Sequence, residues 1–211
     1  GTIQHNILSI IKYYLVRNNM EESKKPILGR PQKLNRDHVL NVAMMSYWAD
    51  GPTYVSINEI CKRADVSKPG LYREFGSEDG LKHAALIAYR TMAYNPIYKI
   101  LETEQTFDQG LEAIINFFIF YRQARGLPCG CLHVDMRQQK EKFGALTVEK
   151  IDSFQQEIQA RFETWIDRAK VRDEFKVDML TSNATLYIFA QLISAMRLQK
   201  EGTEQKIVES F

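Results

Sequence analysis

Two short amphipathic segments in tandem, over residues 56–75, restrict the fold of this chain more than any other feature. Ser56 is a residue type that caps helices, and Glu59 follows at the spacing of a capping box. Apolar side chains then fall on one face of Ile57–Ala64, and a second capping residue, Ser67, stands three positions further on. The pattern predicts two short helices joined by a tight turn.

The second of these helices has one apolar face and one polar face. Pro69 is tolerated in a first turn, and Leu71 and Phe75, four residues apart, would hold the helix against a core. In a helix-turn-helix, the polar face of such a second helix enters the major groove of DNA. A helical hairpin that binds nothing is the alternative. The DNA-binding candidates here are Ser56, Ser67, Lys68, Pro69, Gly70, Tyr72 and Arg73.

Residues Arg36 to Ala88 resemble the DNA-binding domain of the TetR family of bacterial transcriptional regulators. The resemblance covers about a quarter of the chain. It is carried by a first helix Arg36–Asp50, a turn at Gly51, the two helices above, the pair Tyr72 and Phe75, and the run Gly76, Ser77 and Leu81 that opens a connecting helix Ser77–Tyr94.

Four positions depart from the pattern usual in that family. Asp65 replaces a Gly, Gly70 a common Thr, and Glu78 a common Lys, while Glu74 adds a carboxylate to the second helix. Fewer phosphate contacts would give DNA affinity a shallower salt dependence, because each contact contributes about −0.9 to the slope of log K against log salt. Alternatively, Glu74 accepts a hydrogen bond from cytosine in the groove.

The resemblance implies an all-α fold, in which a three-helix helix-turn-helix DNA-binding domain precedes a helical ligand-binding and dimerisation domain. We assign residues 1–35 to an N-terminal extension and basic arm, 36–80 to the DNA-binding domain and 81–211 to the second domain. The implied partners are a second copy of the chain, double-stranded DNA with an inverted repeat, and a small-molecule inducer that releases a repressor from its operator. No cofactor and no enzymatic activity are implied.

The distribution of charge agrees with this division. The formal net charge of the chain is only +2, but Lys24 to Gly76 carry nine Lys and Arg against five Asp and Glu. A basic N-terminal part on a mildly acidic body suits a DNA-binding protein with a separate regulatory part. Three cysteines without a paired framework, and no apolar run of about 18 residues, predict a cytoplasmic protein that does not span a membrane.

The first residues leave two questions open. Apolar residues repeat at helical spacing over residues 3–15, so either an extra helix precedes the DNA-binding domain or Met20 is the native start. Between Glu21 and Leu34 the chain reads as a polar linker. Within this linker Arg30 and Lys33 form a basic arm that either enters an A·T-rich minor groove or is simply solvated.

The remainder predicts helices throughout. Leu81–Ile100 is amphipathic with a kink or stop near Asn95, before Pro96. Further helices are expected over Phe107–Ala124, Gly130–Gln139, Leu146–Arg172 and Val177–Lys200.

The resemblance places an inducer pocket and a two-fold four-helix interface in this body. The ligand-binding candidates are Tyr98, Phe117, Phe118, Tyr121, Met136, Phe154, Trp165, Tyr187 and Gln191, which suggest a hydrophobic or aromatic molecule. Ordinary core packing is the alternative for any aromatic at helical spacing. The dimerisation candidates are Phe154, Ile158, Phe162, Ala184, Ile188 and Ala195.

Two other interpretations of the sequence compete with a ligand-responsive regulator. Cys131 precedes a predicted helix and could act as a thiol sensor with Cys129 as its resolving partner. Acidic departures in the helix-turn-helix would instead suit a helical ligand-binding dimer with a degenerate DNA-binding domain. A metal site is not predicted, because Cys129, Cys131 and His133 lack an evident fourth ligand, and no nucleophile or phosphate-loop motif is present.

Overall fold

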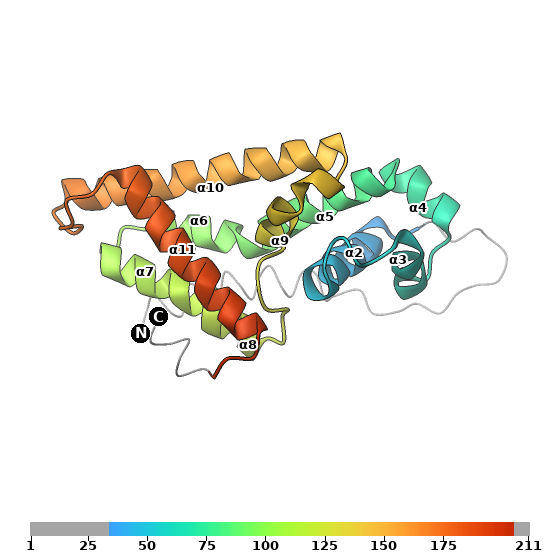
Figure 1. Ribbon diagram of the computed structural model, residues 1–211, viewed down its shortest axis with the longest axis horizontal. Helices are drawn as coiled ribbons and strands as arrows, with labels where there is room; N and C mark the ends of the chain where they lie inside the picture. Colours follow the sequence, from blue (N-terminus) through green and yellow to red (C-terminus); the bar gives the residue numbers. More distant parts are fainter. Residues whose placement is uncertain (1–33, 205–211) are drawn as a thin grey trace.

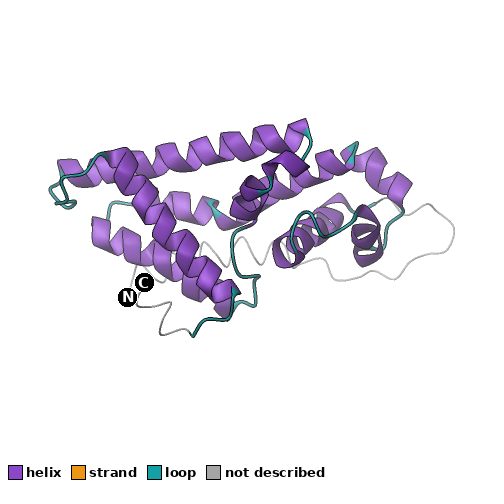
Figure 2. Ribbon diagram, viewed as in Figure 1, coloured by secondary structure: helices purple, strands orange, loops and turns teal. Residues whose placement is uncertain are grey.

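The computed structural model describes residues 34–204, and this part of the chain is helical with no strand (Figures 1 and 2). The all-α prediction is therefore confirmed for these residues. The predicted arm residues Arg30 and Lys33, and the apolar segment in residues 1–19, lie outside the described residues. Within residues 34–204, no helix has both the length and the apolar character needed to cross a bilayer.

The first three described helices form a small unit at one end of the molecule (Figure 1). Helix α2 spans Arg36–Asp50, α3 spans Ile57–Ala64 and α4 spans Lys68–Phe75, as the sequence predicts. Their apolar faces meet in a core of fully buried side chains, among them Tyr47, Trp48, Ile60 and Leu71.

Helix α5 (Glu78–Ala93) leads from this unit into the body of the molecule (Figure 1). Its first turn is capped by Ser77, whose Oγ accepts a hydrogen bond from the Gly80 N–H at 3.0 Å. The helix ends at Tyr94, and α6 (Asn95–Glu102) begins at once, with Pro96 in its first turn. The predicted stop near Asn95 is confirmed.

The body contains the remaining helices. In chain order they are α7 (Phe107–Ile115), a π-helical segment η1 (Asn116–Tyr121), α8 (Arg122–Ala124), α9 (Leu132–Gln138), a 3₁₀ turn η2 (Lys140–Lys142), α10 (Ala145–Val171) and α11 (Thr181–Lys200). The long α10 runs along one side of the molecule beside α5, and α11 crosses the body beneath it (Figure 1).

Two of these helices differ from the sequence prediction. The segment Phe107–Ala124 is predicted as one α-helix, but its middle widens into a π-helix. Helix α11 begins at Thr181 rather than Val177. The preceding link is held in a non-helical path because Phe175 packs edge-on against Phe107, with 5.3 Å between ring centroids, and its N–H is bonded to Ala169.

Polar contacts connect the body to the preceding part of the chain at two places, one on α5 and one in the turn between α2 and α3. The Asp79 carboxylate accepts hydrogen bonds from the N–H groups of Leu146 (3.0 Å) and Thr147 (3.3 Å), and thus caps α10. The Thr53 hydroxyl, in the turn between α2 and α3, donates to Gln139 Oε1 at 2.7 Å. The second contact joins the unit of α2 to α4 directly to the body.

Candidate nucleic-acid interface and ligand cavity

The turn between α3 and α4 is built from local capping contacts. The Ser56 Oγ accepts from the Glu59 N–H at 3.2 Å, as predicted, while the Glu59 carboxylate pairs with Arg63. Asp65 ends α3 with φ 53° and ψ 50°, the left-handed conformation that glycine adopts most readily. Asp tolerates this conformation better than most residues, so the turn keeps its shape despite the departure from Gly.

Helix α4 presents a cationic outer face. Lys68, Pro69 and Arg73 are exposed, and Tyr72 is half-buried. The Lys68 ammonium lies 5.7 Å from the centre of the Tyr72 ring. Ser56 and Ser67 are also exposed, and a capping hydroxyl that accepts a bond from the helix retains its own O–H for a phosphate. The structure thus gathers the predicted groups at one end of the molecule.

Gly70 and Glu74 are less available for contacts with DNA than the sequence suggests. Gly70 is buried, and its N–H donates to the Ser67 Oγ at 3.2 Å, so this N–H does not point freely toward a phosphate. The Glu74 carboxylate pairs with Arg36 at 3.1 Å, and the Arg36 guanidinium lies 5.1 Å from the centre of the Phe75 ring. Partial neutralisation by Arg36 reduces the repulsion that Glu74 exerts on DNA.

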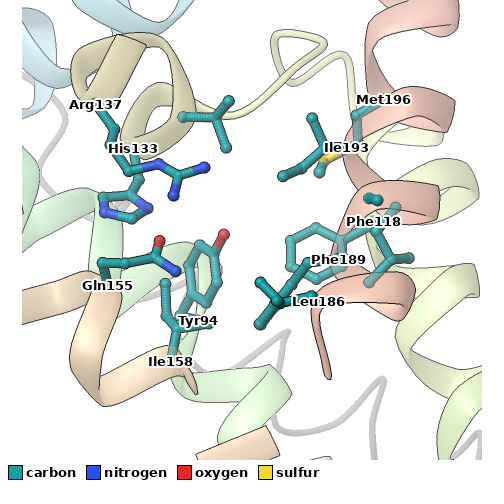
Figure 3. A pocket seen from close by; sticks show the side chains of 13 residues that line it. Tyr94, Phe118, His133, Arg137, Gln155, Ile158, Leu186, Phe189, Ile193 and Met196 are labelled. Atoms are coloured by element: carbon teal, nitrogen blue, oxygen red, sulfur yellow. The ribbon is translucent and has the colours of Figure 1, made fainter. Parts of the chain in front are cut away.

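A cavity of about 230 Å³ lies in the body, between the end of α5, η1, α9, α10 and α11 (Figure 3). Apolar side chains supply most of its wall, and a few polar groups lie among them. The lining residues are Tyr94, Phe118, His133, Val134, Arg137, Gln155, Ile158, Leu186, Phe189, Ala190, Leu192, Ile193 and Met196. This composition is that of a small-molecule site.

Two polar residues of the wall have defined protonation states. Burial lowers the pKa of His133 to about 4, so its ring is neutral at physiological pH. Its Nε2 lies 3.1 Å from the Ile151 carbonyl, to which it donates. Burial also raises the pKa of the Tyr94 phenol well above its ordinary value, so the hydroxyl keeps its proton. Tyr94 additionally forms the C-terminal end of α5.

Of the predicted ligand residues, Phe118 lines this cavity. Most of the others pack elsewhere in the core: Trp165 stacks on Phe107 with 4.4 Å between ring centroids, and Phe154 packs edge-on against Tyr94. The remaining members of the predicted set are buried Tyr98, Phe117 and Met136, half-buried Tyr121 and Gln191, and exposed Tyr187. His133, Arg137, Gln155 and Phe189 line the cavity but are not among the predicted ligand-binding residues.

The predicted dimerisation residues are packed inside a single chain. Phe154, Ile158, Phe162, Ala184, Ile188 and Ala195 are each at most 9% exposed. Their burial therefore requires no partner. The exposed large apolar side chains of α11 are instead Leu186 and Tyr187, at 58% and 61%.

A buried arginine joins the cavity wall to the first helices. Arg122 is 3% exposed, and its guanidinium lies 4.5 Å from the centre of the Phe118 ring and 3.8 Å from the Met196 Sδ. It also donates to the Gly130 carbonyl at 3.1 Å. The same carbonyl accepts from the Trp48 indole N–H of α2 at 3.2 Å.

Cys131 lies beside this group, at the N-terminal end of α9 as predicted, but it is only 3% exposed. Its Sγ is 3.3 Å from each of the hydroxyls of Tyr89 and Tyr94. Buried structural cysteines are generally inert, because reagents and oxidants do not reach them. Among residues 34–204, no cluster of three His, Cys, Asp or Glu side chains is placed to hold a metal ion.

Comparison with known proteins bears on the first helices most directly. Residues 39–85 match the family described as bacterial regulatory proteins, tetR family. The helix-turn-helix region is therefore similar to that of TetR-family regulators. The matched region runs from α2 into the first half of α5, and so contains the whole helix-turn-helix.

One curated protein and several solved structures are also similar to this chain. The chain is 29% identical over 112 residues to the HTH-type transcriptional repressor ComR of Escherichia coli K12, and the match spans 51% of each protein. The chain thus spans about half the length of this curated relative. Its fold is similar to that of regulatory protein TetR from Rhodobacter sphaeroides (TM-score 0.74, 17% identity, 84% of this chain and 94% of that one). It is also similar to a cysteine mutant of the TetR family transcriptional regulator CifR complexed with 26-bp operator DNA (TM-score 0.71, 18% identity, 85% and 94%).

Proposed function

We propose that this chain is a homodimeric DNA-binding transcriptional regulator, a repressor that leaves its operator when a small molecule occupies the body cavity. The exposed cationic face of α4, within a TetR-family domain, carries the DNA-binding part of the proposal. The proposed contacts to bases and phosphates come from Ser56, Ser67, Lys68, Pro69, Tyr72 and Arg73. The description of ComR as a repressor supports the sign of regulation.

Helix α5 supports the proposed response to ligand. Tyr94 at one end of α5 lines the cavity, while Ser77 at the other end immediately follows Gly76, where α4 stops. A ligand that displaces Tyr94 would therefore move α5, and α4 is joined directly to the other end of α5. The chain of contacts from Met196 through Arg122 and the Gly130 carbonyl to α2 offers a second route.

A ligand shifts the protein between two states only by binding them with different affinity. In the proposed mechanism, the occupied cavity favours a placement of α5 that changes the separation of the two recognition helices in the dimer. A coupling of about 1–3 kcal/mol, the usual scale, changes operator affinity by roughly 5- to 150-fold.

The proposed dimer surface is the exposed face of α11. Asn183, Leu186, Tyr187, Ala190 and Arg197 are exposed at helical spacing along it. Pairing across a two-fold axis would cover Leu186 and Tyr187 and set two copies of α4 one DNA turn apart. We expect Tyr187→Glu to yield monomers in sedimentation velocity, whereas the control Tyr54→Glu, at a side chain 83% exposed in the DNA-binding domain, stays dimeric.

The function is tested by selecting DNA from a library of genomic fragments with the purified full chain. We expect enrichment of an inverted repeat whose half-sites are about 10 bp apart, or a multiple of that spacing. Failure to enrich any sequence at low salt contradicts the proposal and favours the rival, a helical ligand-binding protein whose DNA-binding domain has degenerated. Operator release by thiol oxidants that is lost in Cys131→Ser would favour the thiol sensor instead.

A further inference from the structure

The body cavity is chemically asymmetric (Figure 3). Its polar residues, Arg137, His133, Gln155 and Tyr94, lie together on one side, while Phe118, Phe189, Leu186, Ile193 and Met196 lie on the other. A ligand that fills such a site needs a polar group at one end and an apolar body. The arrangement of polar and apolar side chains therefore restricts the chemistry of the ligand more than the presence of aromatic side chains does.

The size of the cavity limits the apolar body. A cavity of about 150 Å³ in an apolar protein core holds benzene, and the cavity in this protein is about 230 Å³. One aromatic ring with a short substituent fits, and larger polycyclic molecules would require the wall to move.

Arg137 supplies a positive charge at the polar end. Its guanidinium is directed into the cavity from α9, beside the side chains of His133 and Gln155 (Figure 3). Among residues 34–204, Arg137 forms no ion pair. Asp135 on the same helix pairs with Lys200 at 3.0 Å, and Asp152 pairs with Lys140. The charge of Arg137 thus stays available to a ligand.

The other polar groups that line the cavity add no negative charge to offset that of Arg137. No Asp or Glu is present among the lining residues, so a cationic ligand would meet no counter-charge. His133 is neutral, as described above, and the Gln155 amide and the Tyr94 hydroxyl add dipoles without net charge. A guanidinium forms paired hydrogen bonds with carboxylates and with phosphates, and the smaller carboxylate suits a cavity of about 230 Å³ better.

We propose that the cavity binds a small organic acid, with an anionic carboxylate at Arg137 and a single aromatic ring or short aliphatic body against the apolar wall. This inference rests on the proposed ligand-responsive function. The sequence alone predicts only that the ligand is hydrophobic or aromatic. It adds a charge requirement that neither the fold nor the family supplies.

The test uses three probes with the same carbon skeleton: cinnamate, cinnamamide and cinnamylamine. Calorimetric titration of the full chain, without DNA, measures each affinity. We expect cinnamate to bind at least about tenfold more tightly than the amide, the scale of one charge-assisted hydrogen bond, and the amine to bind most weakly. Arg137→Gln should remove the preference for cinnamate, and Arg137→Lys should retain part of it.

Arg63→Gln is the matched control. Arg63 is an exposed arginine on α3 that pairs with Asp50 and Glu59 and does not line the cavity, so its loss changes the net charge equally and should leave the three affinities unchanged. Equal affinity for acid and amide, no binding of cinnamate, or an unaltered preference in Arg137→Gln overturns the inference. These titrations contain no DNA, so they test the ligand site separately from the proposed function. If the chain binds cinnamate but selects no operator, the proposed function is contradicted and the ligand site is supported.

Discussion

Gly80 lies in the first turn of α5, directly behind the end of α4, and we predict that its replacement by Ala destabilises the chain. A Cβ at this position would lie 2.0 Å from the Phe75 carbonyl oxygen and 3.2 Å from the Phe75 carbonyl carbon. Ordinary contacts begin near 3.4 Å, so α4 and α5 would have to separate by roughly 1.4 Å at this corner.

The direction of the change in the free energy of unfolding distinguishes close packing at this corner from ordinary helix propensity. Replacing Gly by Ala inside a helix normally stabilises a protein by about 0.5–1 kcal/mol. Here the close approach costs about 1–3 kcal/mol by overpacking, and displacement of the Gly80 N–H from the Ser77 Oγ weakens a cap whose worth is about 1 kcal/mol. We expect a net loss of about 1–3 kcal/mol in the free energy of unfolding.

Urea unfolding followed by circular dichroism measures this loss in Gly80→Ala. Ala160→Gly, at an exposed site in the middle of α10, serves as the control, because it calibrates helix propensity in the same chain and should cost about 0.5–1 kcal/mol. A Gly80→Ala variant as stable as the wild type, or more stable, would refute the packing described for this corner.

Three further outcomes follow from single contacts. Asp65→Gly should raise the free energy of unfolding by about 0.5–1 kcal/mol, because it relieves a left-handed non-glycine residue; lower stability in urea would contradict this. Trp48→Phe should cost about 1–2 kcal/mol and weaken the effect of ligand on operator affinity, because it removes the N–H bound to Gly130; an unchanged ligand response would exclude this route. The Arg90 guanidinium lowers the pKa of Glu157, so the folded state binds fewer protons than the unfolded state, and stability should fall as pH drops through and below the ordinary glutamate range; Glu157→Gln should show a smaller fall, and identical pH profiles would refute this role.

Local signals made the first helices predictable. The caps Ser56 and Ser67 act over three residues, and the apolar face of each helix can be read directly from its spacing. The sequence places the start of α11 four residues too early, because the packing of Phe175 on Phe107 joins residues far apart in sequence and overrides the local pattern.

The ligand cavity was much harder to predict. A buried aromatic gives the same helical period whether it faces a cavity, as Phe118 does, or fills the core, as Trp165 does. Arg137 and His133 stand on a helix of seven residues that is too short for a periodic signal, and the side chains opposite them come from other helices. Such a constellation arises only from tertiary packing.

Binding to the selected operator, measured by fluorescence anisotropy for the wild type and for Arg73→Ala, tests the central claim most directly. We predict that the wild type binds the operator about a thousandfold or more tightly than scrambled DNA at physiological salt. Arg73→Ala, which removes an exposed cation of α4, should cost about 1–3 kcal/mol of binding free energy. Equal affinity for operator and scrambled DNA at every salt concentration, or full operator affinity in Arg73→Ala, would contradict the assignment of α4 as the helix that reads DNA.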